Sequence, residues 1–299
     1  MPYNYDNVLI NHSDLGVGIM KWKRSERLVD MTRHLLENPH TLISLTFFSN
    51  RYTAAKSSIS EDLGILKETF EESGTGRLIT ISGASGGIKY IPIASREEVN
   101  DIIHSLMDEL RNSDRLLPGG YLYMTDLLGN PMFLDRIGKV IATAFFDAGI
   151  DAIMTVATKG IPIAHAIARH LNVPVVVVRR DSKVTEGSTV SINYVSGSAR
   201  RIQTMVLSKR SMQSGQKVLL TDDFMKVGGT MQGMKSLLEE FDCELGGVAV
   251  LVEAEHLEEV LVDDYLSLVK LHAVDEKHRK IELEEGNYFT RGGNDIWNM

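Results

Sequence analysis

The run Val218–Thr230, with the sequence VLLTDDFMKVGGT, constrains the fold of this chain more than any other feature. Its first apolar residues, 218–220, predict a buried strand, and the apolar spacing that follows predicts a helix over 230–241. Between strand and helix, Gly228 and Gly229 allow the backbone to turn sharply and to approach a ligand closely. The run therefore predicts a ligand-binding junction between a strand and a helix.

The polar groups of this junction suit a sugar phosphate. Free N–H groups at the start of the helix, together with the Thr230 hydroxyl, make a site for an anion. The adjacent carboxylates of Asp222 and Asp223 suit the diol of a sugar, with or without a metal ion. An ordinary strand–turn–helix junction with Asp222 as the helix cap is the alternative, but it explains less of the pattern.

The run resembles the phosphoribosyl pyrophosphate (PRPP) motif of the type I phosphoribosyltransferase family: four apolar residues, two acids, a short turn and Gly-Gly-Thr. The resemblance implies that the acids bind the ribose hydroxyls and that the turn holds the 5-phosphate. It assigns to PRPP the residues Asp222, Asp223, Phe224, Met225, Lys226, Val227, Gly228, Gly229 and Thr230. Two positions depart from the transferase pattern, since Val227 replaces a threonine and Lys226 places a charge where a small residue is common.

A second loop, Ala157–Gly160, follows the apolar segment 152–156. It stands where the same family places its pyrophosphate loop, so the resemblance implies that its backbone amides and Lys159 hold the diphosphate. The residues assigned to PRPP here are Ala157, Thr158, Lys159 and Gly160. A Lys-Gly pair after a strand is a weak signal alone, and its place upstream of the Asp222 run strengthens it.

Almost wholly apolar segments alternate with helical patterns over 152–156, 173–178, 217–220 and 248–252. Such strands are typical of a parallel sheet that is covered on both faces. Binding loops are expected at the carboxyl ends of these strands, and both loops described above fall there. The predicted fold class is therefore α/β, with a mainly parallel sheet covered by helices.

The flanking segments complete this domain. Helices are expected over 99–110 and 131–148. The tail from His256 is expected to add a further helix and strands near 267–273 and 279–284.

The N-terminal part has the element order of a winged helix-turn-helix. The pattern predicts three helices and then a hairpin, over 25–38, 45–52, 54–72, 78–82 and 88–93. The third helix is then the recognition helix, and small hydroxyl and basic side chains on its outer face suit the major groove and phosphates.

The predicted DNA contacts come mainly from this third helix, its neighbours and the hairpin. They are Lys21, Arg24, Arg27, Lys56, Ser57, Ser58, Ser60, Lys67, Arg77, Lys89, Arg200 and Arg201. Arg77 and Lys89 are expected to flank the glycine-rich tip of the hairpin. A winged helix that binds only protein is the alternative.

Residues 179–210 form a basic segment on an acidic body. Their charge is +5, whereas the rest of 94–299 sums to −13. Alternating residues predict a hairpin over 189–195 and 202–207. In the type I family a mobile hairpin here closes over PRPP, and Lys183 is assigned to PRPP. The segment would meet PRPP phosphates, DNA phosphates or both in turn, and an ordinary solvated face is the alternative.

Composition and charge narrow the class of protein. The chain has 299 residues, of which 43% are hydrophobic and 24% charged, as in globular proteins. No apolar run approaches the roughly 18 residues that span a membrane, and the start lacks the pattern of a signal peptide. One cysteine, Cys243, excludes an intrachain disulfide and suits a reducing cytosol, so a cytoplasmic location is expected. The nine histidines show no zinc-site spacing, so no metal site of protein ligands alone is expected.

The expected domain organisation has three parts. Residues 1–19 lack periodicity and are expected to be a tail or extension. Residues 20–93 would form the DNA-binding domain, with a linker over 92–98. Residues 94–299 would form the phosphoribosyltransferase-like domain for PRPP sensing and dimerisation.

Together these parts resemble the family of purine operon repressors of Gram-positive bacteria, over about Met20 to Tyr288. The resemblance is carried by the runs Arg27–Asp30, Lys56–Asp62, Pro118–Tyr123, Met154–Pro162, Val184–Gly197 and Thr221–Gly229. It implies a homodimer that binds palindromic operator DNA, represses purine synthesis genes, is released by PRPP and has no catalytic activity. It also implies that Tyr121 borders the ligand and that guanosine alarmones compete for the pocket, with Mg²⁺ held through PRPP if it is present.

An active purine phosphoribosyltransferase is the alternative function. Such an enzyme needs a hood over the base, and the DNA-binding module takes the natural place of that hood. Val227 also departs from the transferase motif. Both features favour a sensor.

Overall fold

The computed structural model describes residues 22–83, 86–119, 121–181, 187–196, 201–255 and 261–291, without the side chains of Ser196 and Arg201. The predicted extension over 1–19 lies outside the described residues. The predicted site residues Lys21, Lys183 and Arg200 also lie outside them. Every helix in the described part is too short or too polar to cross a membrane.

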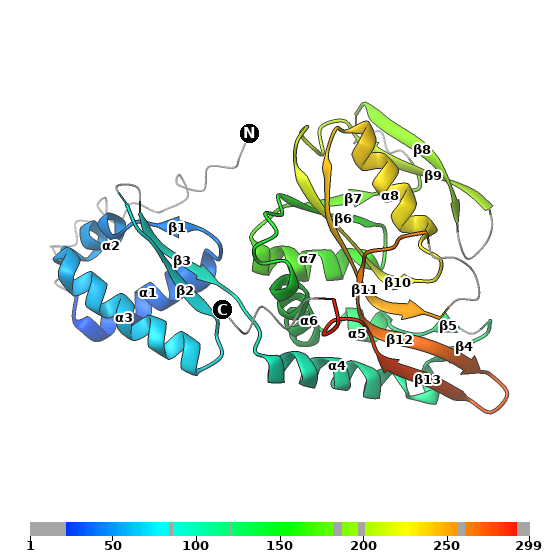
Figure 1. Ribbon diagram of the computed structural model, residues 1–299, viewed down its shortest axis with the longest axis horizontal. Coiled ribbons are helices and arrows are strands. Elements are labelled where there is room, and N and C mark those ends of the chain that lie inside the picture. The colour runs from blue at the N-terminus through cyan, green and yellow to red at the C-terminus, as the bar shows by residue number, and fades with distance from the viewer. Residues whose placement is uncertain are drawn as a thin grey trace.

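The N-terminal part has the predicted order of three helices and a hairpin (Figure 1). Its elements are α1 (Arg24–Glu37), β1 (Leu42–Ile43), α2 (Leu45–Tyr52), α3 (Lys56–Glu72), β2 (Arg77–Ile81) and β3 (Gly87–Ile91). The strands form an antiparallel sheet in the order β1-β3-β2. The structure thus confirms the winged-helix order.

The apolar stripe of α3 faces the core of this part. Ile59, Leu63, Leu66 and Phe70 are all buried, at the helical spacing that the sequence contains. Each such side chain contributes about 1.5–3 kcal/mol when it leaves water. Because this stripe fixes the rotation of α3, the opposite face of the helix stays in solvent.

The C-terminal part is an α/β domain. Its elements are α4 (Arg96–Leu110), a 3₁₀ helix (Ser113–Arg115), β4 (Leu116–Leu117), β5 (Tyr121–Leu122), α5 (Thr125–Leu128), α6 (Pro131–Ala144), β6 (Ala152–Val156), α7 (Gly160–Leu171), β7 (Val175–Val178), β8 (Thr189–Ser196), β9 (Arg201–Ser208), β10 (Lys217–Met225), α8 (Gly229–Glu240), β11 (Glu244–Ala254), β12 (Leu266–Asp275) and β13 (Lys280–Glu285). The main sheet has the order β13-β12-β11-β10-β6-β7, and only β13 is antiparallel to its neighbour. The predicted mainly parallel sheet is confirmed.

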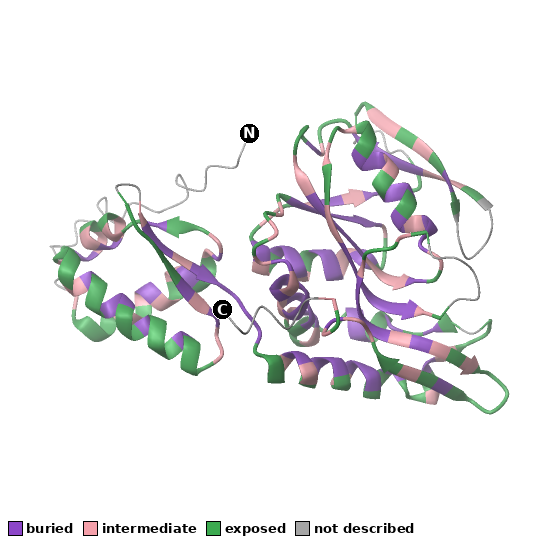
Figure 2. Cartoon of the chain, viewed as in Figure 1, coloured by how far each residue is buried: buried purple, intermediate pink, exposed green. Residues whose placement is uncertain are grey.

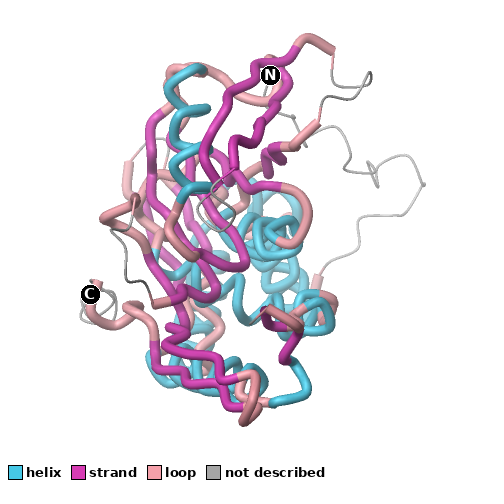
Figure 3. Tube along the Cα trace, turned by 90° about the vertical axis from the view of Figure 1, so that its right-hand side faces the viewer, coloured by secondary structure: helices cyan, strands magenta, loops and turns pink. Residues whose placement is uncertain are grey.

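Helices cover both faces of this sheet. The helices α4, α6 and α7 share one core with the sheet, and α8 shares a second core with the hairpin of β8 and β9. In the side view, α8 lies apart from the helices of the other face (Figure 3). The strand β6 is buried throughout, and β10 and β11 are buried over 218–221 and 248–253, which explains the apolar sequences there (Figure 2).

The hairpin of β8 and β9 is packed on α8. Tyr194 and Met205 are buried, and a Cβ added to Gly233 of α8 would stand 3.0 Å from each of their side chains. A backbone bridge from Arg179 to Val206 also joins the hairpin to the end of β7. This packing holds the hairpin against α8 and β7, and the expected closure of the hairpin over PRPP stays a prediction.

Several predicted elements differ from the structure in their bounds or in their presence. The helix α4 begins at Arg96, within the predicted linker, because the Ser95 hydroxyl accepts a hydrogen bond from the Glu98 amide and caps the helix. The helix α6 ends at Ala144, four residues before the predicted end. The tail residues 261–291 contain strands β12 and β13 but no helix, so the further helix expected from His256 is not found in them.

Polar contacts join the two parts of the chain. The Lys139 ammonium on α6 donates to the Gly74 carbonyl after α3 (3.1 Å) and to Glu98 (2.8 Å). The Asn172 amide after α7 donates to the Thr41 hydroxyl beside β1 (3.2 Å). The N-terminal part is therefore held at two points, after α3 and beside β1, against the helices that cover the main sheet.

Candidate functional site

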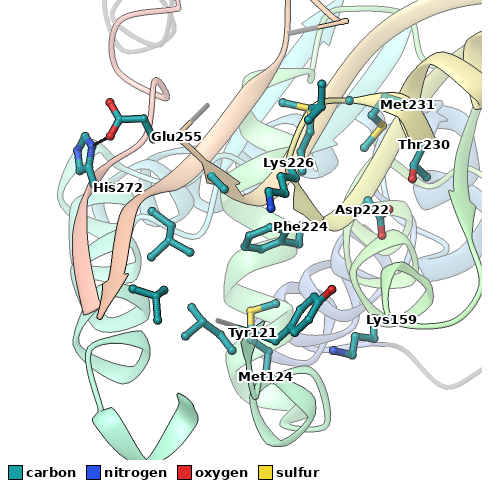
Figure 4. Close-up of a pocket in the computed structure, with 18 of the residues that line it drawn as sticks. Tyr121, Met124, Lys159, Asp222, Phe224, Lys226, Thr230, Met231, Glu255 and His272 are labelled. Atoms are coloured by element: carbon teal, nitrogen blue, oxygen red, sulfur yellow. Dashed lines mark hydrogen bonds and ion pairs between the residues drawn. The ribbon is translucent and has the colours of Figure 1, made fainter. Parts of the chain in front are cut away.

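A cavity of about 310 Å³ opens at the carboxyl ends of the parallel strands. It contains the predicted residues Tyr121, Lys159, Asp222, Phe224, Met225, Lys226, Val227, Gly228, Gly229 and Thr230. Asp222, Thr230 and Lys159 gather on one side of it, and Tyr121 and Phe224 lie towards the middle (Figure 4). The structure thus brings both predicted loops to one site.

The turn after β10 forms the start of α8. Gly228 has a φ of +85°, a left-handed conformation that suits glycine. The Gln232 amide donates to the Gly228 carbonyl (2.8 Å), and the Leu261 amide donates to the Val227 carbonyl (3.0 Å). Because α8 begins at Gly229, the unbonded N–H groups of its first turn and the Thr230 hydroxyl can receive an anion.

The two acids belong to β10 itself. The sequence predicted that this strand ends at Leu220, and this boundary was wrong. Pairing with β11 continues through Asp222 and Phe224 to Met225, so the neighbouring strand satisfies the backbone of the acidic residues. The Asp223 amide donates to Asp222 Oδ1 (2.9 Å). Burial and the adjacent Asp223 carboxyl raise the pKa of Asp222 well above its ordinary value.

The loop before α7 closes the other side of the site. Gly160 lies so close to Asp222 that an added Cβ would stand 2.9 Å from Asp222 Oδ1 and 2.1 Å from Thr155 Oγ1. A residue with a side chain would therefore displace the acid. Lys159, the residue before, lines the cavity and brings a positive charge to it.

Four of the predicted PRPP residues in the described part do not line the cavity. These are Ala157, Thr158, Gly160 and Asp223. Gly160 lies beside Asp222, and the Asp223 amide donates to Asp222 Oδ1, so both residues help to position that acid. The Ala157 amide donates to the Val178 carbonyl (2.9 Å), which ties the loop to β7.

The sequence predictions missed half of the residues that line the cavity. The missed residues are Gly119, Leu122, Met124, Met231, Ala254, Glu255, Leu271, His272, Ala273 and Val274. Most come from β5 and from the ends of β11 and β12. A signal was present for β12, since a parallel strand beside β11 ends at the same edge of the sheet.

An ion pair stands at the end of the cavity away from Lys159. His272 Nδ1 lies 2.8 Å from Glu255 Oε2, and its Nε2 lies 2.9 Å from Glu284 Oε1 (Figure 4 shows the first contact). These two carboxylates raise the pKa of His272. The cavity therefore has a polar end for anions and a second charged end, with an apolar middle.

The described residues contain no group of three or more His, Cys, Asp or Glu side chains placed to hold a metal. Asp222 and Asp223 could supply at most part of a Mg²⁺ shell. Because Mg²⁺ prefers six oxygen ligands, the remainder would have to come from water and from ligand oxygens.

The outer face of α3 is a candidate surface for nucleic acid. Lys56, Ser57, Ser60 and Lys67 are exposed, and Ser58 is half-buried. These side chains begin at the N-terminal end of the helix, where free N–H groups also favour phosphate. The structure thus leaves the predicted recognition face open to solvent.

The two predicted DNA-contacting arginines of α1 pair with an acid of α3. Arg24 and Arg27 both donate through Nε to the buried Asp62 of α3, at 2.8 Å and 2.9 Å. Arg27 has only 14% of its side chain exposed. Its guanidinium holds α1 against α3, and its predicted contact with DNA stays a prediction.

The hairpin residues differ from the prediction. Arg77 pairs with Ile91 at the base of the β2–β3 hairpin, and Ile81 pairs with Gly87 beside its tip. Arg77 therefore lies four residues, or about 13 Å, from the tip that it was expected to flank. Lys89 is closer to the tip, opposite Ile79. The backbone of Arg201 begins β9.

Comparison with known proteins agrees with this two-part architecture. Residues 23–92 match the family model "Bacterial purine repressor, N-terminal", and residues 124–285 match the model "Phosphoribosyl transferase domain". The purine biosynthesis transcriptional repressor PurR of Bacillus subtilis (strain 168) is 58% identical over 269 residues, covering 90% of this chain and 94% of that protein. The chain belongs to the bacterial purine repressor family.

Relatives with other names align as well. The purine biosynthesis transcriptional activator PurR of Lactococcus lactis subsp. lactis (strain IL1403) is 48% identical over 268 residues, covering 90% of this chain and 99% of that protein. A xanthine phosphoribosyltransferase of Heliobacterium modesticaldum is 30% identical over 156 residues, covering 49% of this chain and 82% of that enzyme. The predicted membership of the bacterial purine repressor family is confirmed.

Proposed function

We propose that this chain represses transcription of purine biosynthesis genes by binding operator DNA, and that PRPP releases it. The names of its full-length relatives support the regulatory role. The PRPP response rests mainly on one observation. Lys159 and the start of α8 stand on either side of Asp222 in a single cavity.

The cavity offers a partner to each part of PRPP. The first turn of α8 and the Thr230 hydroxyl would receive the 5-phosphate, and Asp222 would accept hydrogen bonds from the ribose diol. Lys159 would neutralise the diphosphate. Mg²⁺, where present, would be held by PRPP oxygens together with the acids.

Release of DNA would follow from charge. PRPP brings several negative charges to a site beside the basic segment 179–210, whose Arg180 acts electrostatically on Asp222. If operator phosphates use the same segment, ligand and DNA compete for it. A coupling free energy of about 1–3 kcal/mol is enough for regulation. Guanosine alarmones carry similar phosphates and would compete with PRPP for the cavity.

Operator binding with and without PRPP tests the proposal. Asp222→Ala should bind operator DNA as tightly as the unchanged protein, because the winged-helix domain is untouched, but should no longer respond to PRPP. Fluorescence anisotropy with DNA from upstream of purine genes measures both. Loss of DNA binding in Asp222→Ala would show that the cavity does more than sense the ligand.

Purine phosphoribosyltransferase activity is the second candidate, because a xanthine phosphoribosyltransferase aligns with about half of the chain. It is tested by mixing the protein with PRPP, Mg²⁺ and each purine base in turn. Pyrophosphate release that depends on the base would overturn the assignment as a sensor without catalysis.

We propose in addition that the functional unit is a homodimer. A palindromic operator presents two half-sites related by a two-fold axis, and a dimer matches this symmetry. Analytical ultracentrifugation should give twice the mass of one 33.3 kDa chain. Relatives are named both repressor and activator. A purine-gene reporter therefore has to measure whether this protein lowers or raises transcription.

A further inference from the structure

A buried arginine stands behind the wall of the cavity. Arg115 has 7% of its surface exposed and does not line the cavity. Its Nε donates to the Glu109 carbonyl (2.7 Å), and its two terminal nitrogens contact Asp126 as a bidentate pair (2.7 Å and 2.9 Å). The same nitrogens also reach the Tyr123 carbonyl (3.0 Å) and the Glu109 carboxylate (2.7 Å). Every nitrogen of the guanidinium is therefore engaged.

Arg115 holds Tyr123 by both of its backbone groups. The Tyr123 amide donates to the Arg115 carbonyl (2.8 Å), and the Tyr123 carbonyl accepts from the Arg115 side chain (3.0 Å). The residues on either side of Tyr123, Leu122 and Met124, are buried and line the cavity, as does Tyr121. By holding the backbone of Tyr123, Arg115 fixes the position of its two neighbours, which line the cavity.

The other backbone support of this wall is the pairing of β4 with β5 and a hydrogen bond from the Leu128 amide to the Met124 carbonyl (2.9 Å). The strands β4 and β5 have two residues each and pair at only two positions. A two-stranded hairpin of this kind is marginal by itself. The planar guanidinium, by contrast, fixes several acceptors in one geometry.

We propose that Arg115 is a positioning residue that fixes the Tyr121–Met124 wall and thereby sets the affinity of the cavity for its phosphorylated sugar ligand. The part about the ligand rests on the proposed function. Arg115 itself touches no ligand.

The test compares Arg115→Lys, which keeps the charge but loses the planar fork, with Arg111→Ala. Arg111 serves as the control, because its half-exposed side chain forms an ion pair with Asp108 at the surface. Calorimetry should show PRPP binding about tenfold weaker in Arg115→Lys, with operator affinity in the absence of PRPP unchanged. Arg111→Ala should match the unchanged protein in both.

A double-mutant cycle separates positioning from a general loss of stability. The effects of Arg115→Lys and Tyr121→Ala on PRPP affinity should be less than additive, since both act through one wall. The effects of Arg115→Lys and Lys159→Ala should add, because Lys159 belongs to the loop before α7 and not to this wall. Additivity in both cycles would overturn the proposal.

Amide hydrogen exchange tests the positioning role of Arg115 without any ligand. Arg115→Lys should speed exchange at Tyr123 and its neighbours and leave α8 unchanged. If the unchanged protein fails to bind PRPP, the proposed function is wrong. The exchange rates still decide whether Arg115 positions the wall. If Arg115→Lys does not fold, Asp126→Asn removes the bidentate partner at a half-exposed carboxylate and should give the same faster exchange. Unchanged exchange in the folded variant overturns the proposal.

Discussion

Asp222 shows how a binding group can oppose the stability of the folded chain. Its pKa is raised by burial and by the adjacent Asp223 carboxyl, so the folded protein without ligand keeps a proton there over a wider pH range than the unfolded chain does. A ribose diol or a metal ion needs the carboxylate as acceptor. Binding of such a ligand should therefore release a proton, and its affinity should rise with pH.

The first prediction is that Asp222→Asn stabilises the ligand-free protein. The raised pKa of the folded state means that stability is lost as pH rises from the unfolded value near 3.8 through the folded value. The neutral amide removes this loss, for an expected gain of about 1 kcal/mol at neutral pH. Thermal melts across pH measure it, and the gain should vanish below about pH 4. A variant less stable than the unchanged protein at pH 7 would contradict the prediction.

Gly160 tests the spacing between the two loops. In Gly160→Ala, the new Cβ would meet Thr155 Oγ1 at 2.1 Å and Asp222 Oδ1 at 2.9 Å, so the site must shift. We expect a loss of about 1–3 kcal/mol in stability, together with loss of PRPP binding. Chemical denaturation and calorimetry measure the two effects. Gly64→Ala is the control, because its Cβ enters open space within a helix and should stabilise by about 1 kcal/mol. Full PRPP affinity in Gly160→Ala would refute the argument.

Among the helices and strands, the sequence pattern predicted those bounds that depend on residues nearby in the chain. The bounds of α2 and β6 agree with the predictions, because an apolar face and its flanking signals determine them. The extension of β10 through Asp222 was missed, since it depends on pairing with β11. The wall from β12 was missed for the same reason, because only the order of strands brings Leu271–Val274 to the cavity.

The predicted recognition helix, α3, can be tested through Lys56. Lys56→Ala should weaken binding to operator and to unrelated DNA by a similar factor, because a phosphate contact carries no sequence information. The slope of log affinity against log salt should fall by about one. Anisotropy titrations at several salt concentrations measure this. Lys277→Ala, in the turn between β12 and β13, serves as the control and should leave the slope unchanged. Loss of operator affinity alone would instead indicate a base contact at Lys56.

At the scale of the whole molecule, α7 connects the two sites. It begins at Gly160 beside Asp222, and the residue after its end, Asn172, contacts Thr41 of the DNA-binding part. The neighbouring α6 contacts the end of α3 through Lys139 and the Gly74 carbonyl. These contacts give a shift at the loop before α7 a physical route to the N-terminal part.

Lys139→Met should weaken this coupling. The methionine keeps the length of the side chain but cannot donate to Gly74 and Glu98. We expect operator and PRPP affinities to persist separately, while the effect of PRPP on operator binding falls by about 0.5–2 kcal/mol. Operator titrations with and without saturating PRPP measure it. Arg136→Ala, on the exposed side of the same helix, should leave the effect intact. An undiminished PRPP effect in Lys139→Met would exclude this contact from the route.

The two margins of the main sheet bear on how the protein behaves at high concentration. An open strand margin can pair with another chain and start aggregation. At one margin, the Arg179–Val206 bridge joins β7 to the packed hairpin. At the other, β13 has exposed Lys280, Glu282 and Glu284 around the buried Ile281, and charged strands of this kind resist such pairing. Removing the charges of Lys280 and Glu282, neither of which lines the cavity, would thus lower the protein concentration at which aggregation begins.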